Sequence, residues 1–405
     1  MASSKADERW RVSGPKAWPR PPKDMTVSTL TEIEECPKRW ALRHAQYPEL
    51  WSQRGYPPKL RLASLAGTVI HLTLERIVKE LARAGCDSVQ DSNGLQIMRT
   101  LGGYSKVITD CIEQVLHQAA TNPRAQPLLD LVRVQLKAQL SEIRIQTQTM
   151  LCRVQLPWVA ARSGRSSGAR YPLTEGVFTE IEFRVPQLNW KGKADLLVLS
   201  PVICELTDFK TGISDDSHRF QIRVYALLWQ RDNELNPSSR KANRLILFYK
   251  SGNIEVPALT EDEFGLFERE VMDRGQAARA SVDHDPIQAR PSVDTCRHCE
   301  VRHLCEDYWT ERIQRQFADA SDRKYGDAQI TILRRHGSSS WDAEIEISSA
   351  TSISRKALLR TNTEDVFRCG ERLRILDVGV SIDGDADAQT VVFTAGKLSE
   401  TYVLP

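Results

Sequence analysis

The sequence predicts an α/β core with a mixed sheet, preceded by a helical region and followed by a small all-β domain. Three observations lead to this prediction. Apolar residues recur at helical spacing through residues 27–152, strand-like alternation begins near residue 176, and short alternating stretches fill residues 326–405. The length of 405 residues is typical of two or three domains.

Composition places the chain among ordinary folded proteins. It is 41% hydrophobic and 27% charged, and its 55 Lys and Arg nearly balance 53 Asp and Glu, so neither wholesale disorder nor a polyelectrolyte tail is expected. No apolar run approaches the roughly 18 residues of a membrane helix, and the first 24 residues lack the apolar centre of a secretory signal. We therefore expect a soluble cytoplasmic protein without membrane association.

The helical region follows residues 1–26, a charged, proline-rich segment that we expect to form a flexible or extended arm. Thr29-Leu30-Thr31-Glu32 has the form of a capping box, so a helix should begin near Thr29 and be interrupted at Cys36-Pro37. Apolar residues at helical spacing predict three longer helices, over 64–84, 104–120 and 126–152.

Beyond a loop rich in Gly, Ser and Arg (162–170), the hydrophobic period changes from that of a helix to that of a strand. Ser200-Pro201 marks a turn between two of the expected strands. The predicted elements are strands over 176–186, 188–199 and 203–210, a helix over 217–231, a strand over 244–250 and an acidic helix over 260–280. This order is typical of an α/β core with a mixed sheet.

Five short alternating stretches in the last part of the chain predict a small β-barrel, over 329–333, 341–347, 373–382, 390–394 and 400–404. Residues 370–377 and the later strands resemble OB-like barrels, which bind single strands on a basic, aromatic face. From residue 310 onward, however, aromatic residues are few, and 13 Lys and Arg face 15 Asp and Glu. A DNA-binding barrel and a protein-docking barrel therefore both remain open.

Candidate catalytic residues lie on two neighbouring strands of the predicted core. Because side chains alternate along a strand, Asp208 and Lys210 share one face, with Phe209 behind them. Asp195 can converge on them if the two strands pair around the turn. Two carboxylates and an ammonium suit a divalent cation that polarises a phosphate, while the lysine handles the nucleophile or the developing charge. Asp195 is flanked by Ala194 and a run of apolar residues, where an unpaired charge is costly.

Other polar residues are expected near this pair of strands. His71 lies at the edge of the apolar face of helix 64–84, where a buried core histidine would also fit. Gln221 and Tyr225 are four residues apart and share one helix face. Glu182, on the strand before Asp195, either supports the site from behind or is simply exposed.

Four segments resemble, in residues, order and spacing, the motifs of the RecB-like branch of the PD-(D/E)xK nucleases, which includes the CRISPR-associated exonucleases. They are Ala66–His71, Gly192–Asp195, Asp208–Gly212 and Gln221–Tyr225. The resemblance covers about residues 27–310 and implies a restriction-endonuclease-like core. It implies that His71, Asp195, Asp208 and the backbone carbonyl of Phe209 bind Mg²⁺ or Mn²⁺, that Lys210 is the catalytic lysine, and that Gln221 and Tyr225 position the substrate. Asp208 stands where Glu is common elsewhere in the superfamily.

Three of the nine cysteines, Cys296, Cys299 and Cys305, crowd together, which is unlike a disulfide framework. Together with Cys36, four thiolates could hold zinc or a cubane cluster, and His298 and His303 are alternative ligands. The pattern resembles the four-cysteine [4Fe-4S] staple of CRISPR-associated and AddB-like nucleases, which favours iron–sulfur over zinc. The remaining cysteines are expected to be small buried hydrophobes: Cys86, Cys111, Cys152, Cys204 and Cys369.

Together, these observations predict a metal-dependent DNA nuclease with a nuclease domain over 27–310 and a barrel domain over 326–405. The resemblance implies an exonuclease for single-stranded DNA or DNA ends, in repair, CRISPR adaptation or antiphage defence. The chain has no Gly-x4-Gly-Lys-Ser/Thr phosphate loop, so any helicase motor would be a separate polypeptide. Two alternatives are a non-catalytic nucleic-acid-binding subunit and a zinc-stapled scaffold, although the scaffold leaves the Asp and Lys residues unexplained.

Overall fold

The computed structural model describes residues 10–52, 55–156, 170–319, 325–350, 354–361, 367–384 and 389–405. Residues 1–9 of the predicted arm and 162–169 of the predicted loop lie outside this description. The chain divides into two compact units. We call the unit formed by Pro21–Thr31 and Lys59–Ala280 the core unit. The barrel unit comprises Met1–Arg20, Glu32–Pro58 and Ser281–Pro405.

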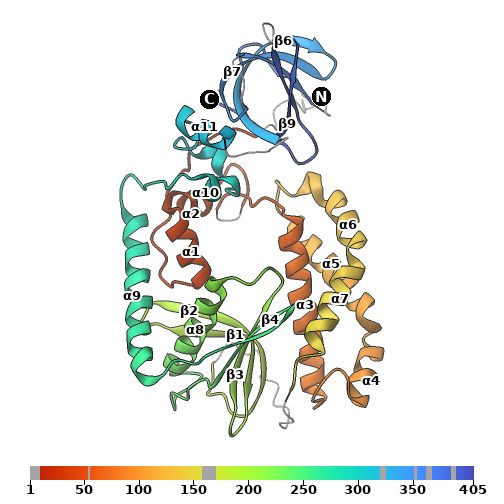
Figure 1. Ribbon diagram of the computed structural model, residues 1–405, viewed down its shortest axis with the longest axis vertical. Helices are drawn as coiled ribbons and strands as arrows, with labels where there is room; N and C mark the ends of the chain where they lie inside the picture. Colours follow the sequence, from red (N-terminus) through yellow and green to blue (C-terminus); the bar gives the residue numbers. More distant parts are fainter. Residues whose placement is uncertain are drawn as a thin grey trace. The chain divides into compact units, whose positions relative to one another are not determined.

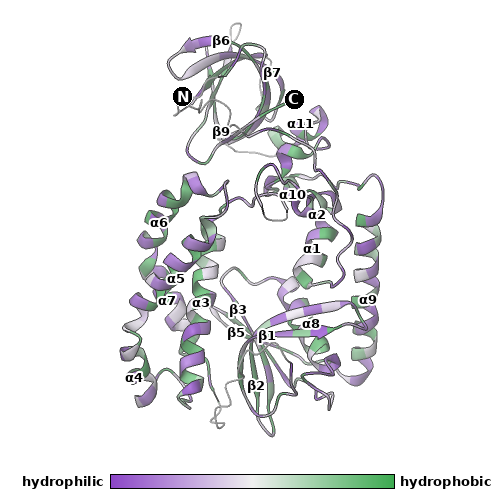
Figure 2. Ribbon diagram, turned by 180° about the vertical axis from the view of Figure 1, so that it is seen from behind, coloured by the Kyte–Doolittle hydropathy of each residue, from purple (hydrophilic) through white to green (hydrophobic). Residues whose placement is uncertain are grey.

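The core unit contains a bundle of helices that alternate between hydrophobic and hydrophilic residues along their length (Figure 2). They are α3 (Leu62–Arg83), α4 (Ser92–Thr100), α5 (Gly103–Ala119), α6 (Leu129–Ala138) and α7 (Leu140–Leu151). The first two long predicted helices agree with α3 and α5 to within two residues. The predicted helix 126–152 is instead divided at Gln139. The short α4, whose N–H groups are capped by Asp91, was not predicted because it carries few apolar residues.

The sheet of the core unit is mixed, as predicted. Its strands are β1 (Gly176–Val185), β2 (Trp190–Leu199), β3 (Cys204–Lys210), β4 (Arg244–Tyr249) and β5 (Gly252–Val256), in that spatial order. β3 and β4 are parallel and are joined by α8 (Asp216–Arg231), whereas the other pairs are antiparallel. The sequence pattern missed β5, which forms a hairpin with β4.

The two faces of this sheet are covered differently (Figure 1). Leu196, Phe209 and Phe248 pack into the apolar cluster of α3, α5 and α7. Asp208 and Lys210 are the chain neighbours of Phe209. Because side chains alternate along a strand, both project towards the other face, which α8 covers. The chemistry-bearing residues of β3 therefore lie on the α8 side. The helix α9 (Glu261–Asp283) follows β5 in the chain.

Two helices flank Cys36, and their boundaries correct the predicted capping box. The first, α1 (Val27–Glu35), begins before Thr29, because the Thr26 Oγ1 accepts the Thr29 N–H at 3.1 Å. It ends before Pro37, which then occupies the first turn of α2 (Pro37–His44). The proline thus starts a second helix in addition to interrupting the first.

The described part of the predicted arm, residues 10–26, is extended, and backbone pairing holds it at three points. In the barrel unit, Arg11 forms a bridge with Val403 and Ala17 with Gln46. In the core unit, Met25 forms a bridge with Trp190, and its side chain is fully buried. Apolar side chains within this charged segment provide the burial that a loose arm would lack.

The barrel of the barrel unit consists of a ring of five strands. These are β6 (Tyr325–Gly337), β7 (Ser340–Ser348), β8 (Lys356–Arg360), β9 (Arg372–Asp383) and β10 (Thr390–Thr394), and β11 (Glu400–Val403) adds to β9. The pairings β6–β7, β7–β8, β8–β10, β10–β9 and β9–β6 close the ring, with β8 and β10 parallel. The sequence pattern missed β8, whose Ala-Leu-Leu centre lacks both alternation and β-branched residues.

The cysteine-containing segment packs on this barrel within the same unit. It includes α10 (Val293–Arg297) and leads to α11 (Glu311–Asp319). The buried Arg302 pairs with Asp327 of β6 at 2.7 Å and with Asp377 of β9 at 2.9 Å, and the Tyr308 hydroxyl donates to Asp327 at 2.6 Å. Arg374 of β9 is also buried, and it pairs with Glu306 at 2.8 Å. The boundary between the units therefore does not fall near residue 310.

Every helix in the described part of the chain is too short or too polar to cross a membrane.

Candidate active site

Asp195, Asp208 and Lys210 meet where β2 and β3 separate. The backbone ladder between these strands ends at the pair Leu196–Thr207, so the next residue on each strand is one of the two aspartates. The Asp195 Oδ2 accepts the Phe209 N–H at 2.6 Å, which replaces the lost ladder partner. The Lys210 Nζ lies 2.5 Å from the Asp208 Oδ2. The structure thus brings the three residues together at one strand end.

His71 joins this group from α3. Its Nδ1 lies 3.4 Å from the Asp195 Oδ1. Burial by itself would lower the pKa of His71, but the hydrogen bond that the ring donates to Asp195 and the charges of Asp195 and Asp208 outweigh it, so the pKa is raised. The imidazole therefore faces the carboxylates, as a residue at the edge of an apolar helix face can.

The two aspartates make a strongly anionic, poorly hydrated site. Asp208 is 4% exposed, and burial together with the Asp195 charge raises its pKa to about 6 against the opposing effect of Lys210. A divalent cation would relieve this repulsion, and carboxylate and imidazole are suitable ligands. Among the residues that the structure describes, no three His, Cys, Asp or Glu side chains form a complete metal-binding group. The Lys210 ammonium provides the compensating charge beside Asp208.

Gln221 and Tyr225 extend from α8 towards Lys210 as a chain of hydrogen bonds. The Lys210 Nζ donates to the Gln221 Oε1 at 2.6 Å, and the Gln221 Nε2 donates to the Tyr225 hydroxyl oxygen at 2.6 Å. Burial raises the pKa of Tyr225, so its hydroxyl stays protonated. Gln221 thus contacts the lysine and Tyr225 contacts Gln221, at the helical spacing that the sequence indicated.

Glu180, which the sequence analysis did not single out, lies closer to the site than Glu182. Glu182 forms an ion pair with Arg184. Glu180 has a φ of 54°. It lies opposite Asp195, between the paired residues Thr179–Leu196 and Ile181–Ala194 of β1 and β2. It forms an ion pair with Lys193, and its pKa is raised by burial and by the Asp195 charge. Alternation alone could not separate the two glutamates, because residues two apart on a strand share one face; the β1–β2 register places Glu180 opposite Asp195 and Glu182 opposite Lys193.

The four predicted cluster cysteines all belong to the barrel unit, and none of them forms a disulfide in the described structure. The Cys36 Sγ accepts the N–H groups of Arg39 and Arg290, each at 3.4 Å. Burial raises the pKa of Cys296 and Cys299 to about 11, and that of Cys305 to about 12. Cys305 and Cys36 each raise the pKa of Cys296 further, so these thiols lie within electrostatic reach of one another.

Charged groups on α2 lie next to these thiols. The Lys38 Nζ pairs with Asp307 at 2.6 Å. Against the effect of burial, this pairing and the charges of Cys305 and Cys36 raise the pKa of Lys38, and the charge of Cys299 contributes to the raised pKa of Arg39. Two cations beside four thiols suit a site whose loaded form is anionic. The four thiols do not, however, form a complete metal-binding group in the described residues.

The remaining thiols and histidines differ in part from expectation. Of the five cysteines expected to be buried, Cys152 and Cys369 are exposed, because one follows the last residue of α7 and the other lies in a turn. His298 is exposed. The ring of His303 stacks on Tyr402 of β11, with ring centroids 3.8 Å apart.

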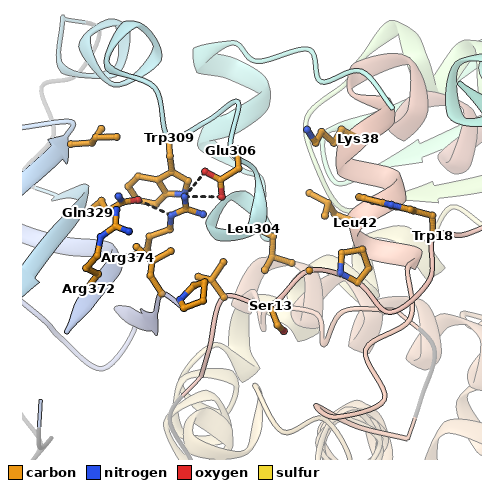
Figure 3. A pocket seen from close by; sticks show the side chains of 16 residues that line it. Ser13, Trp18, Lys38, Leu42, Leu304, Glu306, Trp309, Gln329, Arg372 and Arg374 are labelled. Atoms are coloured by element: carbon orange, nitrogen blue, oxygen red, sulfur yellow. Dashed lines mark hydrogen bonds and ion pairs between the residues drawn. The ribbon is translucent and has the colours of Figure 1, made fainter. Parts of the chain in front are cut away.

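A hollow of about 570 Å³ lies in the barrel unit beside the cysteine segment (Figure 3). The residues labelled there come from the arm, α2, the cysteine segment and the barrel. Its three cationic lining residues are already paired: Arg374 with Glu306, Lys38 with Asp307 and Arg372 with Glu346. The hollow therefore offers little uncompensated charge to an anionic ligand.

The model of the PD-(D/E)XK nuclease superfamily matches residues 24–306. The chain therefore belongs to the PD-(D/E)XK nuclease superfamily, whose members are typically nucleases that use divalent metals such as Mg²⁺. No curated protein matches the chain. Among solved structures, the one titled "Crystal structure of SSO0001" is 13% identical, with 60% of this chain and 96% of that chain covered and a TM-score of 0.22. The assignment rests on the family match.

Proposed function

We propose that this protein is a Mg²⁺- or Mn²⁺-dependent deoxyribonuclease of the RecB-like branch. The observation that carries the proposal is the convergence of Asp195, Asp208 and Lys210 at one strand end, with His71 beside Asp195. His71, the two aspartates and the Phe209 carbonyl would hold the cation. When bound, the cation would supply Lewis-acid activation of water and of the scissile phosphate.

In this proposal, the side chains around the cation have distinct tasks. Lys210 donates its remaining N–H to the attacking water, and its charge offsets the negative charge that develops on the phosphate. Gln221 holds the ammonium in place, and the Tyr225 hydroxyl holds Gln221. Asp195 also accepts the Phe209 N–H, which fixes the backbone that carries the predicted carbonyl ligand. Glu180 adds a further carboxylate near Asp195.

We further propose that the substrate is single-stranded DNA or a DNA end, cleaved as an exonuclease in repair, CRISPR adaptation or antiphage defence. The resemblance of the four motifs to the RecB-like branch supports this. We also propose a helicase or another protein as a partner that acts in trans.

For the cysteines we propose a [4Fe-4S] cluster on Cys36, Cys296, Cys299 and Cys305, with zinc as the alternative metal. The shared location of the thiols, the two N–H groups on the Cys36 Sγ and the cations of α2 support this proposal. When bound, the cluster would join the start of α2 to the segment that packs on the barrel.

For the barrel we propose an OB-like fold that docks a protein. The ring order, with one parallel pair between β8 and β10, supports the OB-like assignment. The outward face of β7 carries Asp342, Glu344 and Glu346, and two of these already pair with basic residues of the same barrel. From residue 310 onward 13 Lys and Arg face 15 Asp and Glu, so this part of the chain lacks the excess positive charge that binds phosphates, which favours a protein partner over DNA.

Purified protein incubated with Mg²⁺ or Mn²⁺ and end-labelled single- and double-stranded DNA tests the central proposal. We expect metal-dependent shortening of the labelled strand, preferentially of single strands, that is lost in Asp208→Asn. A protein that binds DNA but leaves it intact under all of these conditions would instead be a non-catalytic subunit of a DNA-processing complex.

A further inference from the structure

His218 and Tyr249 form a pair next to Lys210 that the motif residues do not include. Tyr249 ends β4 and is the direct neighbour of Lys210 in the parallel β3–β4 register. Its hydroxyl lies 2.8 Å from the Nδ1 of His218, in the first turn of α8. Gln221, which accepts a hydrogen bond from Lys210, follows His218 by three residues and thus lies on the same side of α8.

The pair is built so that one ring nitrogen is held and the other is available. Tyr249 is 2% exposed, and its ring lies 5.8 Å from the His218 ring, so packing fixes the hydroxyl. His218 is half-buried, and within the described part of the chain its Nε2 has no hydrogen-bond partner. Burial and the nearby Lys210 ammonium lower the pKa of His218, which favours the neutral ring.

The protonation state of this ring follows from its partner. Within the described residues the buried Tyr249 hydroxyl has no acceptor other than the His218 Nδ1, so we take the hydroxyl as the donor, which leaves the proton of a neutral imidazole on Nε2. The ring then offers one N–H donor at the edge of the site, beside the lysine. A donor at this position can reach a phosphate without competing with the carboxylates for the cation.

We propose that His218 binds the DNA backbone by donating a hydrogen bond from Nε2 to the phosphate next to the one that is cleaved, and that Tyr249 sets the tautomer that makes this possible. The inference rests on the proposed nuclease function. His218 is thus a substrate-binding residue and Tyr249 a positioning residue. Neither takes part in activating water.

Steady-state cleavage of end-labelled single-stranded DNA by four variants tests this inference. We expect His218→Ala to raise KM roughly fivefold to tenfold, as the loss of one hydrogen bond predicts, with kcat changed less than threefold. His218→Gln places an amide N–H near Nε2 and should recover most of the loss, whereas His218→Asn should not. Tyr249→Phe should raise KM by a smaller factor. His117→Gln, an exposed change on α5, is the matched control.

A second measurement separates binding from folding and from chemistry. In an Asp208→Asn background, where cleavage is blocked, His218→Ala should raise the Kd for labelled DNA by the same factor as it raises KM. The thermal unfolding midpoint should not change. If wild-type protein cleaves DNA and His218→Ala has an unchanged KM, or loses only kcat, the inference is wrong. If wild-type protein cleaves no DNA, the proposed function itself fails.

Discussion

At the scale of single residues, the main feature of the site is a buried carboxylate beside a second carboxylate. Asp208 is nearly inaccessible and lies close to Asp195, so its carboxylate depends on Lys210 for compensation. A cation arriving at this site would meet ligands that already repel one another, which favours its binding. The same arrangement leaves the lysine tethered by a carboxylate and an amide.

The first prediction concerns these charged residues. Asp208→Asn and Lys210→Ala should each lower kcat by roughly a thousandfold or more, because the first removes a proposed cation ligand and the second removes the ammonium that offsets charge on the reacting phosphate. Circular dichroism should show an unchanged fold. Glu182→Gln removes a carboxylate that pairs only with Arg184 among the contacts described, and should cleave like wild type. Full activity of Lys210→Ala would remove the lysine from the mechanism.

A second prediction follows from the chain of hydrogen bonds to the lysine. Gln221→Ala should lower kcat about tenfold to a hundredfold, because the Lys210 ammonium loses one of its two tethers. Tyr225→Phe should have a smaller effect in the same direction, since it acts through Gln221. Kinetics on short oligonucleotides should show KM nearly unchanged in both. An increase in KM alone would indicate direct substrate contact instead.

At the scale of elements, close packing of α8 on β2 positions the α8 residues of the site. A Cβ added at Gly192 would lie 2.9 Å from side-chain atoms of Leu228 and of Tyr225, which is too close for contact. Glycine at this position therefore allows the helix to approach the strand. The motif Gly-Lys-Ala-Asp thus combines a packing residue with Asp195, the proposed cation ligand.

Gly192→Ala should consequently affect both stability and catalysis. We expect about 1–3 kcal/mol of destabilisation from overpacking, measured by denaturant unfolding, together with a lower kcat because Tyr225 is displaced. Gly252→Ala on β5 is the matched control, since a Cβ there meets no atom within 4 Å. Equal stability of the two variants would show that α8 can move away without consequence.

At the scale of the whole chain, each compact unit is assembled from distant segments. In the barrel unit, Arg302 of the cysteine segment depends on Asp327 and Asp377 of the barrel for its buried charge. Removing the barrel would leave this guanidinium without its partners. The described barrel is therefore a support for the cysteine segment as well as a candidate docking module.

Breaking this network should be much more harmful than breaking a surface pair. Asp327→Ala should destabilise the barrel unit by about 3 kcal/mol, because it removes one of the two carboxylates that pair with the buried Arg302 and also removes the acceptor of the Tyr308 hydroxyl. Arg334→Gln, which removes an exposed partner of Asp342, should cost at most about 1 kcal/mol. Thermal unfolding followed by near-ultraviolet circular dichroism would compare the two variants. Similar midpoints would contradict the proposed support.

The proposed cluster makes a further prediction at this scale. Protein purified without oxygen should be brown and contain about four irons per chain. Cys36→Ser should lose this iron, whereas Cys152→Ser, at an exposed thiol, should retain it. Metal analysis by emission spectroscopy distinguishes the outcomes. A colourless anaerobic preparation that contains zinc would overturn the iron–sulfur assignment.

The sequence by itself determined the order of the core elements and the identity of the residues that meet at the site. Helical and strand periods report which local face is buried, so α3, β2, β3 and α8 were predictable near their observed bounds. The spacing of Asp208 and Lys210 also required them to share a face. These are local properties, because each depends on residues only a few positions apart.

Tertiary structure decided what depends on distant partners. The choice between Glu180 and Glu182 follows from the β1–β2 register, which places Glu180 opposite Asp195 and Glu182 opposite Lys193. The pairing of Tyr249 with His218 follows from the parallel register of β3 and β4. The union of the cysteine segment with the barrel follows from the Arg302–Asp327 pair, between residues of different predicted domains. Hydrophobic periodicity in the sequence does not predict such contacts, because the free energy that selects them comes from burial between segments far apart in the chain.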